Sequence, residues 1–402
     1  MAAATTEPRR SAFTIWHVLL LAVPATGVFL WLERVGPNPG TWTLYLFGTA
    51  LISIIPLSQF MGGAVESLHG RINPRLADLL DASLSNLPEL GIGLVLLFHA
   101  ARALLAAQGG TADIIATSTL TVRNDFQIIL ALAIGSVLNN VLLNLGVGVL
   151  FGARKKELTF DASSAASYSS MLALAVVGLA LPTLAQSFSE AKGEELNGTL
   201  QTVSLLVAGV LLATYIIFVL VSTFGWRETG AAKPAPAPRA AQGGTGKIVL
   251  ALVIFGILTL AAASIVGYTA DTVIQAATND PLTPLSVGLV LLPLACNFGE
   301  LFSVLSSARK GDLEDGMEVV GGSAVQVPLL VLPILVFAAA LTGLVVPGIF
   351  LSLIFSPLEL IVLGLVTVIY ALITQDGKAS WLEGVELFAV FVLISATALA
   401  IH

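Results

Sequence analysis

Residues 84–90 read Leu-Ser-Asn-Leu-Pro-Glu-Leu, and residues 295–301 read Ala-Cys-Asn-Phe-Gly-Glu-Leu. Each stretch lies in an apolar part of the chain and places a glutamate three residues after an asparagine. A carboxylate at the centre of a membrane costs about 2.5–3.5 kcal/mol on insertion scales, so it is rarely found there without a polar partner or a function. The Asn-x-x-Glu pattern occurs once in each half of the chain, which predicts a cation site built by two related halves.

The composition indicates an all-α polytopic membrane protein. Of 402 residues, 56% are hydrophobic and 11% are charged, and the mean hydropathy is +0.94. The net charge is −7, and the sequence contains no stripe of basic residues that would bind nucleic acid. The expected partners are therefore the lipid bilayer and small cations. The sequence predicts eleven helical spans at about residues 13–34, 41–66, 76–105, 124–151, 162–187, 198–224, 247–270, 283–308, 316–344, 355–374 and 380–400.

The distribution of Lys and Arg predicts the orientation of these spans. With the N-terminus in the cytoplasm, fourteen Lys and Arg fall on the cytoplasmic side and four on the other side. The apolar run after Arg10 is long and has no convincing cleavage site before Glu33, so we expect a retained first helix rather than a signal peptide. We therefore expect a multi-pass protein of the plasma or inner membrane.

A Pro- and Gly-rich segment at residues 229–246 predicts a flexible cytoplasmic linker. It separates five spans from five more, with the first span left over. An odd number of spans per half gives the halves opposite orientations, as in an inverted repeat with its site between the halves. The expected parts are residues 1–36 (tail and first helix), 37–228 (first repeat), 229–246 (linker) and 247–402 (second repeat).

A second pair of motifs follows the glutamates. Residues 133–140 read Ala-Ile-Gly-Ser-Val-Leu-Asn-Asn, and residues 320–326 read Val-Gly-Gly-Ser-Ala-Val-Gln. The first motif lies farther from its glutamate, which predicts an outward-facing insertion at about residues 100–123. Small residues alone are equally well explained by helix packing. Beside the glutamates, the residues that could complete an ion's ligand shell or hold the carboxylates are Ser136, Asn139, Ser323 and Gln326.

The residue types of the first motifs suit hard cations. Residues i and i+3 share a helix face, so Asn86 lies beside Glu89 and Asn297 beside Glu300. Amide and carboxylate oxygens suit Ca²⁺, Mg²⁺, Mn²⁺ or Na⁺. Two facing glutamates would carry a charge of −2, which matches one divalent cation. A proton competes for the same carboxylates, and this mutual exclusion is the coupling that exchange requires.

Other acidic residues have structural explanations as well. Asp78 and Asp81 precede the first glutamate on nearly one helical face, where they form either a polar access path or a solvated helix end. Glu66 is a similar case, and Glu359 is close to a span start and is expected to be structural. Four histidines show no metal-ligand spacing and are expected to be interfacial: His17, His69, His99 and His402.

These motifs resemble those of the calcium/proton exchanger family of the calcium/cation antiporter superfamily. The resemblance covers the chain from about residue 54 onward, and residues 375–384 (Gln-Asp-Gly-Lys-Ala-Ser-Trp-Leu-Glu-Gly) are similar to a specific family signature. It implies an N-terminal helix plus two inverted five-helix halves. It also implies export of cytoplasmic Ca²⁺ in exchange for H⁺ by alternating access, with no cofactor beyond the transported ions. The residues implied to bind cation and proton are Glu89 and Glu300, assisted by Asn86 and Asn297, with Glu66 in proton handling or access.

The chain departs from the family pattern next to the glutamates. Pro88 stands where Thr, Ala or Val is usual, and Leu301 replaces a histidine. Cys296 replaces a glycine, and Asp81 stands where asparagine is typical and adds negative charge. Leu-Pro-Glu at residues 87–89 also leans toward sodium/calcium exchangers. The sequence therefore leaves the identity of the transported ion and of its counter-ion undecided.

Two further classes of function are retained beside Ca²⁺/H⁺ exchange. One keeps the site and changes the ions, as a Na⁺-coupled Ca²⁺ exchanger or an H⁺-coupled transporter of Mn²⁺ or Na⁺. The other is a channel or cation-sensing receptor with a static site. The chain has no His-Glu-x-x-His, no Gly-x-Gly-Asp pair and no nucleotide-binding loop, so we do not expect an enzyme.

Overall fold

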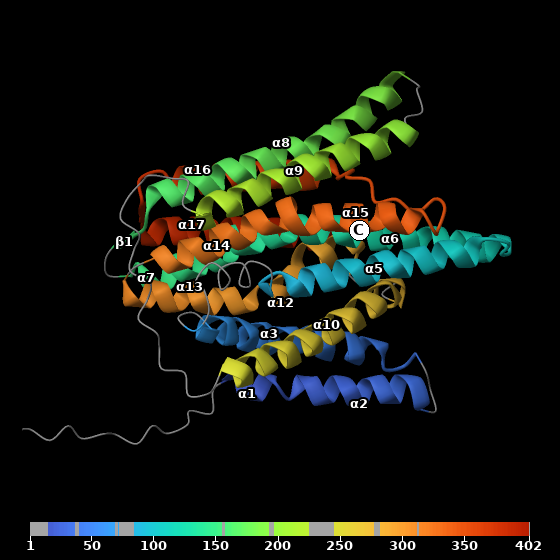
Figure 1. Cartoon of the computed structure of the whole chain (residues 1–402), viewed down its shortest axis with the longest axis horizontal. Coiled ribbons are helices and arrows are strands. Elements are labelled where there is room, and N and C mark those ends of the chain that lie inside the picture. Colours follow the sequence, from blue (N-terminus) through green and yellow to red (C-terminus); the bar gives the residue numbers. More distant parts are fainter. Residues whose placement is uncertain are drawn as a thin grey trace, which may run out of the picture.

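A computed structural model describes residues 15–36, 40–68, 71, 84–154, 157–192, 197–224, 245–276, 282–311 and 313–401. These residues form one bundle of mostly long helices, with α2, α3 and α10 on one side, α8 and α9 on the other, and α5, α6, α12 and α15 between them (Figure 1). Strands β1 (Leu158–Thr159) and β2 (Lys378–Ala379) pair antiparallel.

The helices before the predicted linker include one π-helical segment, η1. They are α1 (Ile15–Leu19), α2 (Ala22–Val35), α3 (Thr43–Leu68), α5 (Leu87–Ala107), α6 (Ala112–Leu138), η1 (Asn139–Asn144), α7 (Leu145–Gly152), α8 (Ala162–Lys192) and α9 (Asn197–Phe224).

The helices after the predicted linker include two further π-helical segments, η2 and η3. They are α10 (Thr245–Ala276), α11 (Pro284–Ser286), η2 (Val287–Leu291), α12 (Leu292–Cys296), α13 (Phe298–Lys310), α14 (Glu314–Gln326), η3 (Val327–Val331), α15 (Leu332–Gly343), α16 (Pro357–Ile373) and α17 (Trp381–Ala400).

The helix lengths confirm the predicted all-helical polytopic fold. Among the described residues, nine helical runs are long and apolar enough to cross a membrane. The pair Pro284–Cys296 and Phe298–Lys310, bent by 53°, would be a tenth span. The apolar helix α16 has 17 residues and is shorter than the others. The predicted number of eleven is reached only if both the bent pair and α16 are counted.

The segment predicted as an insertion at residues 100–123 is mostly helical, so only the predicted span ends at residues 105 and 124 are wrong. Helix α5 continues to Ala107, and α6 begins at Ala112 rather than near residue 124. Between them Gly109 has a φ of +79°, a left-handed conformation that glycine adopts at little cost. The hydroxyls of Thr117 and Thr119 donate to carbonyls one helical turn back. The threonines are thereby accommodated within the helix.

The two predicted halves are in close contact where α6 crosses the segment η2–α12. A Cβ on Gly135 would lie 2.6 Å from Cγ of Pro293, and a Cβ on Gly288 would lie 2.6 Å from Cβ of Ala131. Glycine is therefore required on both sides of this crossing. Gly135 has the packing role that small residues commonly have in membrane helices.

A π-helical segment follows each Gly-Ser motif. Segment η1 begins at Asn139, three residues after Ser136, and η3 begins at Val327, four residues after Ser323. Single-turn π-helices are uncommon and occur frequently at functional sites. Their matching positions fit the inverted repeat.

Residues 349–356, between α15 and α16, are not helical. Their odd-numbered apolar side chains are buried, as expected for an extended chain. The backbone N–H of Leu353 donates to Oγ of Ser204 at 3.1 Å, and that of Phe355 donates to Oγ1 of Thr183 at 3.0 Å. Backbone groups buried in an apolar protein need such partners.

Glu359 has the structural role that the sequence predicted. Its Oε2 accepts from the N–H of Ser356 at 2.8 Å, and its own N–H donates to Oγ of Ser356 at 3.2 Å. This reciprocal capping box begins α16.

Candidate cation site

Each Asn-x-x-Glu motif begins a helix in the same way. Asn86 precedes α5 with φ −100° and ψ 21°, and Asn297 precedes α13 with φ −97° and ψ 6°. Neither asparagine side chain caps its own helix. The glutamates, Glu89 and Glu300, lie in the first helical turn. The identical start leaves both amide side chains available for contacts elsewhere.

Asn86 forms hydrogen bonds with the end of α14 in the other half. Its Nδ2 donates to Oε1 of Gln326 and, at 3.3 Å, to Oγ of Ser85. The hydroxyl of Ser85 also donates to Gln326 Oε1, at 3.0 Å. Gln326 is thus the residue of the second half that holds the first motif.

Asn297 forms the corresponding bonds with α6 and η1 of the first half. Its Nδ2 donates to Oγ of Ser136 at 3.3 Å and to the carbonyl of Pro293 at 3.0 Å. Its Oδ1 accepts from Nδ2 of Asn140 at 3.3 Å, and its backbone carbonyl accepts from Nδ2 of Asn144 at 3.2 Å. Asn86 is therefore bonded to α14 of the second half, and Asn297 is bonded to α6 and η1 of the first half.

The two glutamates lie in the same region of the interior. Glu89 is fully buried, and the side chains of Asn297 and Ser136 lie beside its carboxylate. Glu300 accepts from Oγ of Ser323 at 2.5 Å. Cys296, which is buried, lies close enough to both Glu89 and Glu300 for both charges to act on its thiol. The structure thus brings the two motifs together around Asn297 and Cys296.

Several buried oxygens in this region have no hydrogen-bond partner of ordinary geometry among the described residues. Both carboxylate oxygens of Glu89 and Oδ1 of Asn86 are in this state, as are Oδ1 of Asn139 and Oδ1 of Asn144. A buried polar atom without a partner costs about 1–3 kcal/mol, which a bound cation, proton or water would offset. Hard oxygens of this kind suit alkaline-earth cations.

The donor set contains few ionisable groups. Among the described residues, no group of three or more His, Cys, Asp and Glu is arranged to hold a metal ion. A cation here would therefore need amide and hydroxyl oxygens in addition to Glu89 and Glu300. Such a set is consistent with a site that releases its ion.

The remaining predicted site residues divide into two groups. Ser136, Asn139, Ser323 and Gln326 are all buried, and Ser136, Ser323 and Gln326 contact Asn297, Glu300 and Asn86 respectively. Glu66 belongs to α3, but its side chain lies outside the described residues, as do Asp78 and Asp81. Sequence reasoning missed Asn140 and Asn144 as partners of the second motif; their four-residue spacing inside an apolar run was the available signal.

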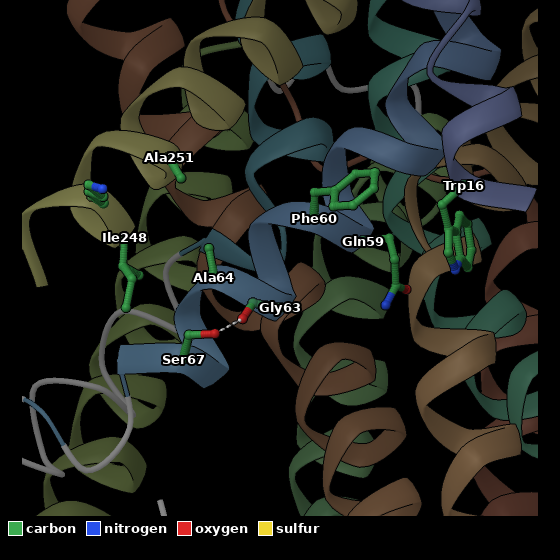
Figure 2. A pocket seen from close by; sticks show the side chains of 9 residues that line it. Trp16, Gln59, Phe60, Gly63, Ala64, Ser67, Ile248 and Ala251 are labelled. Atoms are coloured by element: carbon green, nitrogen blue, oxygen red, sulfur yellow. Dashed lines mark hydrogen bonds between the residues drawn. The ribbon is translucent and has the colours of Figure 1, made fainter. Parts of the chain in front are cut away.

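A cavity of about 460 Å³ lies between α1, α3 and α10, on the side of the molecule where α10 begins (Figure 2). Gln59 lines this cavity and also lies against the second motif, since a Cβ on Gly299 would be 3.4 Å from Gln59 Oε1. Ser67, farther along α3, donates to the carbonyl of Gly63 at 2.8 Å. The other lining residues are Trp16, Phe60, Ala64, Lys247, Ile248 and Ala251.

The fold and the site define a polytopic membrane protein with an inverted repeat and a polar site between its halves, as in secondary transporters. Residues 42–224 and 247–400 match the sequence model of the family described as sodium/calcium exchanger protein, and the chain belongs to that family. The predicted membership of the calcium/cation antiporter superfamily is thereby confirmed.

Individual relatives agree with this family. The chain is 30% identical to a Ca²⁺/H⁺ antiporter of Aphanothece halophytica, over 95% of each chain. It is 26% identical to the Ca²⁺/H⁺ antiporter ChaA of Bacillus subtilis, over 87% of this chain and 90% of that one. Among solved structures, native YfkE aligns with a TM-score of 0.71 at 21% identity, over 96% of this chain and 100% of that chain. The H⁺/Ca²⁺ exchanger CAX aligns with a TM-score of 0.61 at 19% identity, over 96% and 93%. These structures show the same fold.

Proposed function

We propose that this protein is a secondary antiporter that exports cytoplasmic Ca²⁺ in exchange for H⁺ by alternating access. The observation that carries the proposal is the buried Glu89 carboxylate, whose oxygens have no ordinary partner among the described residues and which has Asn297 of the other half beside it. The names of the relatives, Ca²⁺/H⁺ antiporters, favour these two ions.

The proposed coupling is competition for one site. Glu89 and Glu300 bind either Ca²⁺, together with Asn86 and Asn297, or protons. An ion bound on one side is released on the other because the second ligand displaces it. Each asparagine is bonded to the opposite half, so a displacement of the halves changes the geometry of both motifs together.

The cavity beside Gln59 is the proposed access route from the cytoplasm. Its lining includes Lys247 and Ile248 at the start of α10, the helix that follows the predicted cytoplasmic linker in the sequence. This placement assumes a cytoplasmic N-terminus, which the Lys and Arg distribution predicts. In the same reading, Glu66, a residue of α3, and Asp81 would handle protons or access.

Transport in proteoliposomes tests the proposal. A pH gradient should drive ⁴⁵Ca²⁺ uptake in the absence of sodium, and Glu89→Gln or Glu300→Gln should each abolish it. Glu359→Gln is a matched control, because Glu359 is also a buried glutamate of a first helical turn but acts as a cap. Full transport by either site variant would overturn the assignment.

The second candidate keeps the site and changes the counter-ion. It is favoured by Pro88, buried between Asn86 and Glu89, which gives the Leu-Pro-Glu sequence of sodium/calcium exchangers. A sodium gradient at clamped pH would then drive Ca²⁺ uptake. Replacement of Ca²⁺ by Mn²⁺ tests the cargo, and obligatory counterflow excludes a channel.

A further inference from the structure

A second polar cluster lies inside the bundle, away from the cation site. It combines His99 of α5, Asp125 of α6 and Asp271 of α10. His99 follows Glu89 by ten residues on the same helix, which is about 15 Å at the rise of an α-helix. His99 lies eight residues before Ala107, the last residue of α5, and therefore toward the α5–α6 turn.

The contacts within the cluster join three helices. Nδ1 of His99 lies 2.9 Å from Oδ2 of Asp125. The Asp125 side chain is completely buried, and its Oδ1 has no partner of ordinary geometry among the described residues. Asp271 accepts hydrogen bonds from Thr121 at 3.0 Å and from Asn124 at 2.9 Å. Helix α10 is therefore attached to α6 through a carboxylate that lies near the His99–Asp125 pair.

The imidazole lies between the buried carboxylate and a cavity. The cavity has a volume of about 260 Å³ and is lined by His99, Arg102 and Tyr268 together with hydroxyl groups of α6. The His99 side chain is 24% exposed, whereas Asp125 is 0% exposed. The ring of His99 packs edge-on against Tyr268, with centroids 5.6 Å apart. His99 therefore faces this cavity, whereas Asp125 is not among the residues that line it.

The charges that act on His99 come from all three helices. They are Arg102 on its own helix, Asp125 on α6 and Asp271 on α10. The other elements packed against α5 (α12, α15 and η3) contain Cys296 as their one titratable side chain among the described residues. When His99 carries a proton, the two cations and two carboxylates sum to zero. When it does not, one negative charge is left at the contact between α10 and α6.

We propose that His99 and Asp125 form a second proton-binding site, separate from Glu89 and Glu300, whose occupancy sets how α10 is held against α5 and α6. Protons enter from the cavity at the end with the α5–α6 turn, which the charge distribution places outside the cell. The site would report external proton concentration to α10, which packs along α3 and with it lines the proposed access route. Its role as a sensor rests on the proposed function, whereas its existence as a proton site does not.

The proton site is tested without transport. The triple variant His17→Gln, His69→Gln, His402→Gln leaves His99 as the only histidine. In nanodiscs, imidazole nitrogen NMR should show a single titration, and Asp125→Asn should shift its midpoint by about half a pH unit or more. Asp113→Asn, an exposed change on the same helix, should leave it unchanged. A resonance that does not titrate between about pH 5 and 9, or one indifferent to Asp125→Asn, overturns the site.

The sensor role is tested by transport with the pH varied on one side only. His99→Gln should shift the dependence on external pH by about half a unit or more, with the KM for Ca²⁺ on the opposite side unchanged. Asp113→Asn should match the unmodified protein. In the NMR test, Asp271→Asn replaces Asp125→Asn if that variant does not fold, since Asp271 also acts on His99. An unshifted profile for a folded His99→Gln protein overturns the sensor. Absence of Ca²⁺/H⁺ exchange in the unmodified protein would refute the proposed function and leave the NMR result to decide the proton site.

Discussion

Asn297 of the second motif lies beside Glu89 of the first, so the carboxylate of one half has the amide of the other as its neighbour. The same amide nitrogen donates to Oγ of Ser136 at 3.3 Å. Neither half contains the complete arrangement. The pairing therefore makes the position of the two halves relative to each other a determinant of ion affinity.

Replacement of this amide should weaken cation binding. Asn297→Ala removes hydrogen bonds to Ser136 and Asn140 and leaves buried groups without partners, which costs about 1–3 kcal/mol. We expect the KM for Ca²⁺ to rise roughly tenfold or more. Gln186→Ala, which removes an exposed pair with Glu190 on α8, is the control. An unchanged KM for a folded Asn297→Ala protein would contradict the role of this residue.

The buried glutamates should differ sharply in their response to the same substitution. Glu359→Gln should retain transport, since glutamine also fits the third position of a capping box. Ser356→Ala should lower the free energy of unfolding by about 1 kcal/mol, because the cap of α16 is lost. Thermal unfolding in detergent and ⁴⁵Ca²⁺ flux measure the two effects. Loss of transport in Glu359→Gln would mean that this residue belongs to the ion path.

The crossing of α6 with η2–α12 should tolerate no larger side chain. In Gly135→Val the new Cβ would meet Pro293, and overpacking of this kind costs about 1–3 kcal/mol. The midpoint of thermal unfolding should fall by several degrees. Gly27→Val is matched to it, because a Cβ on Gly27 has no atom within 4 Å. Equal unfolding midpoints for the two variants would show that the crossing is looser than described.

The single cysteine should report the state of the site. Cys296 is 3% exposed and lies near both glutamates, so a membrane-permeant thiol reagent should label it slowly. Bound Ca²⁺ should slow the labelling further, and modification should inhibit transport. Mass spectrometry follows the reaction, in which at most one label can attach because the chain has one cysteine. Rapid labelling that Ca²⁺ does not affect would place the thiol away from the ion path.

Acidification on the cytoplasmic side should oppose Ca²⁺ binding. Protons occupy the carboxylates that the cation needs, so the apparent KM for Ca²⁺ should rise as pH falls, by up to about tenfold per pH unit for each proton displaced. Initial rates over a matrix of pH and Ca²⁺ concentration measure this. A KM that is independent of pH would indicate that the cation and the proton use different groups.

Much of this arrangement could be predicted from the sequence because a buried charge in an apolar run is rare. The two Asn-x-x-Glu motifs, with Ser136, Asn139, Ser323 and Gln326, were identified from pattern and resemblance. In the structure Ser136, Ser323 and Gln326 each form a hydrogen bond with a residue of one motif. The hydrogen bonds of each asparagine to the opposite half were not predicted, since spacing along one helix gives no information about a partner on another helix.

The cluster around His99 was missed for a related reason. His99 was expected to be interfacial because no second ligand lies at metal spacing from it. Its partner Asp125 lies on another helix and was placed near the start of a predicted span, because α6 was expected to begin near residue 124. Only the helical extension of α6 to Ala112 puts Asp125 well inside a helix. Because the start of this helix was predicted twelve residues too far along the chain, Asp125 was not recognised as a buried carboxylate.

The extended segment at residues 349–356 affects how many membrane spans a hydropathy profile detects in this chain. Extended backbone advances about 3.3 Å per residue, whereas a helix advances 1.5 Å. A transverse path that combines this segment with the 17 residues of α16 can cover the same thickness as a longer helix while using fewer apolar residues. Ser204 and Thr183 make this possible by accepting from the backbone N–H groups. A hydropathy window that assumes the helical rise throughout will therefore miss spans in any protein that crosses the bilayer partly as extended chain and partly as helix.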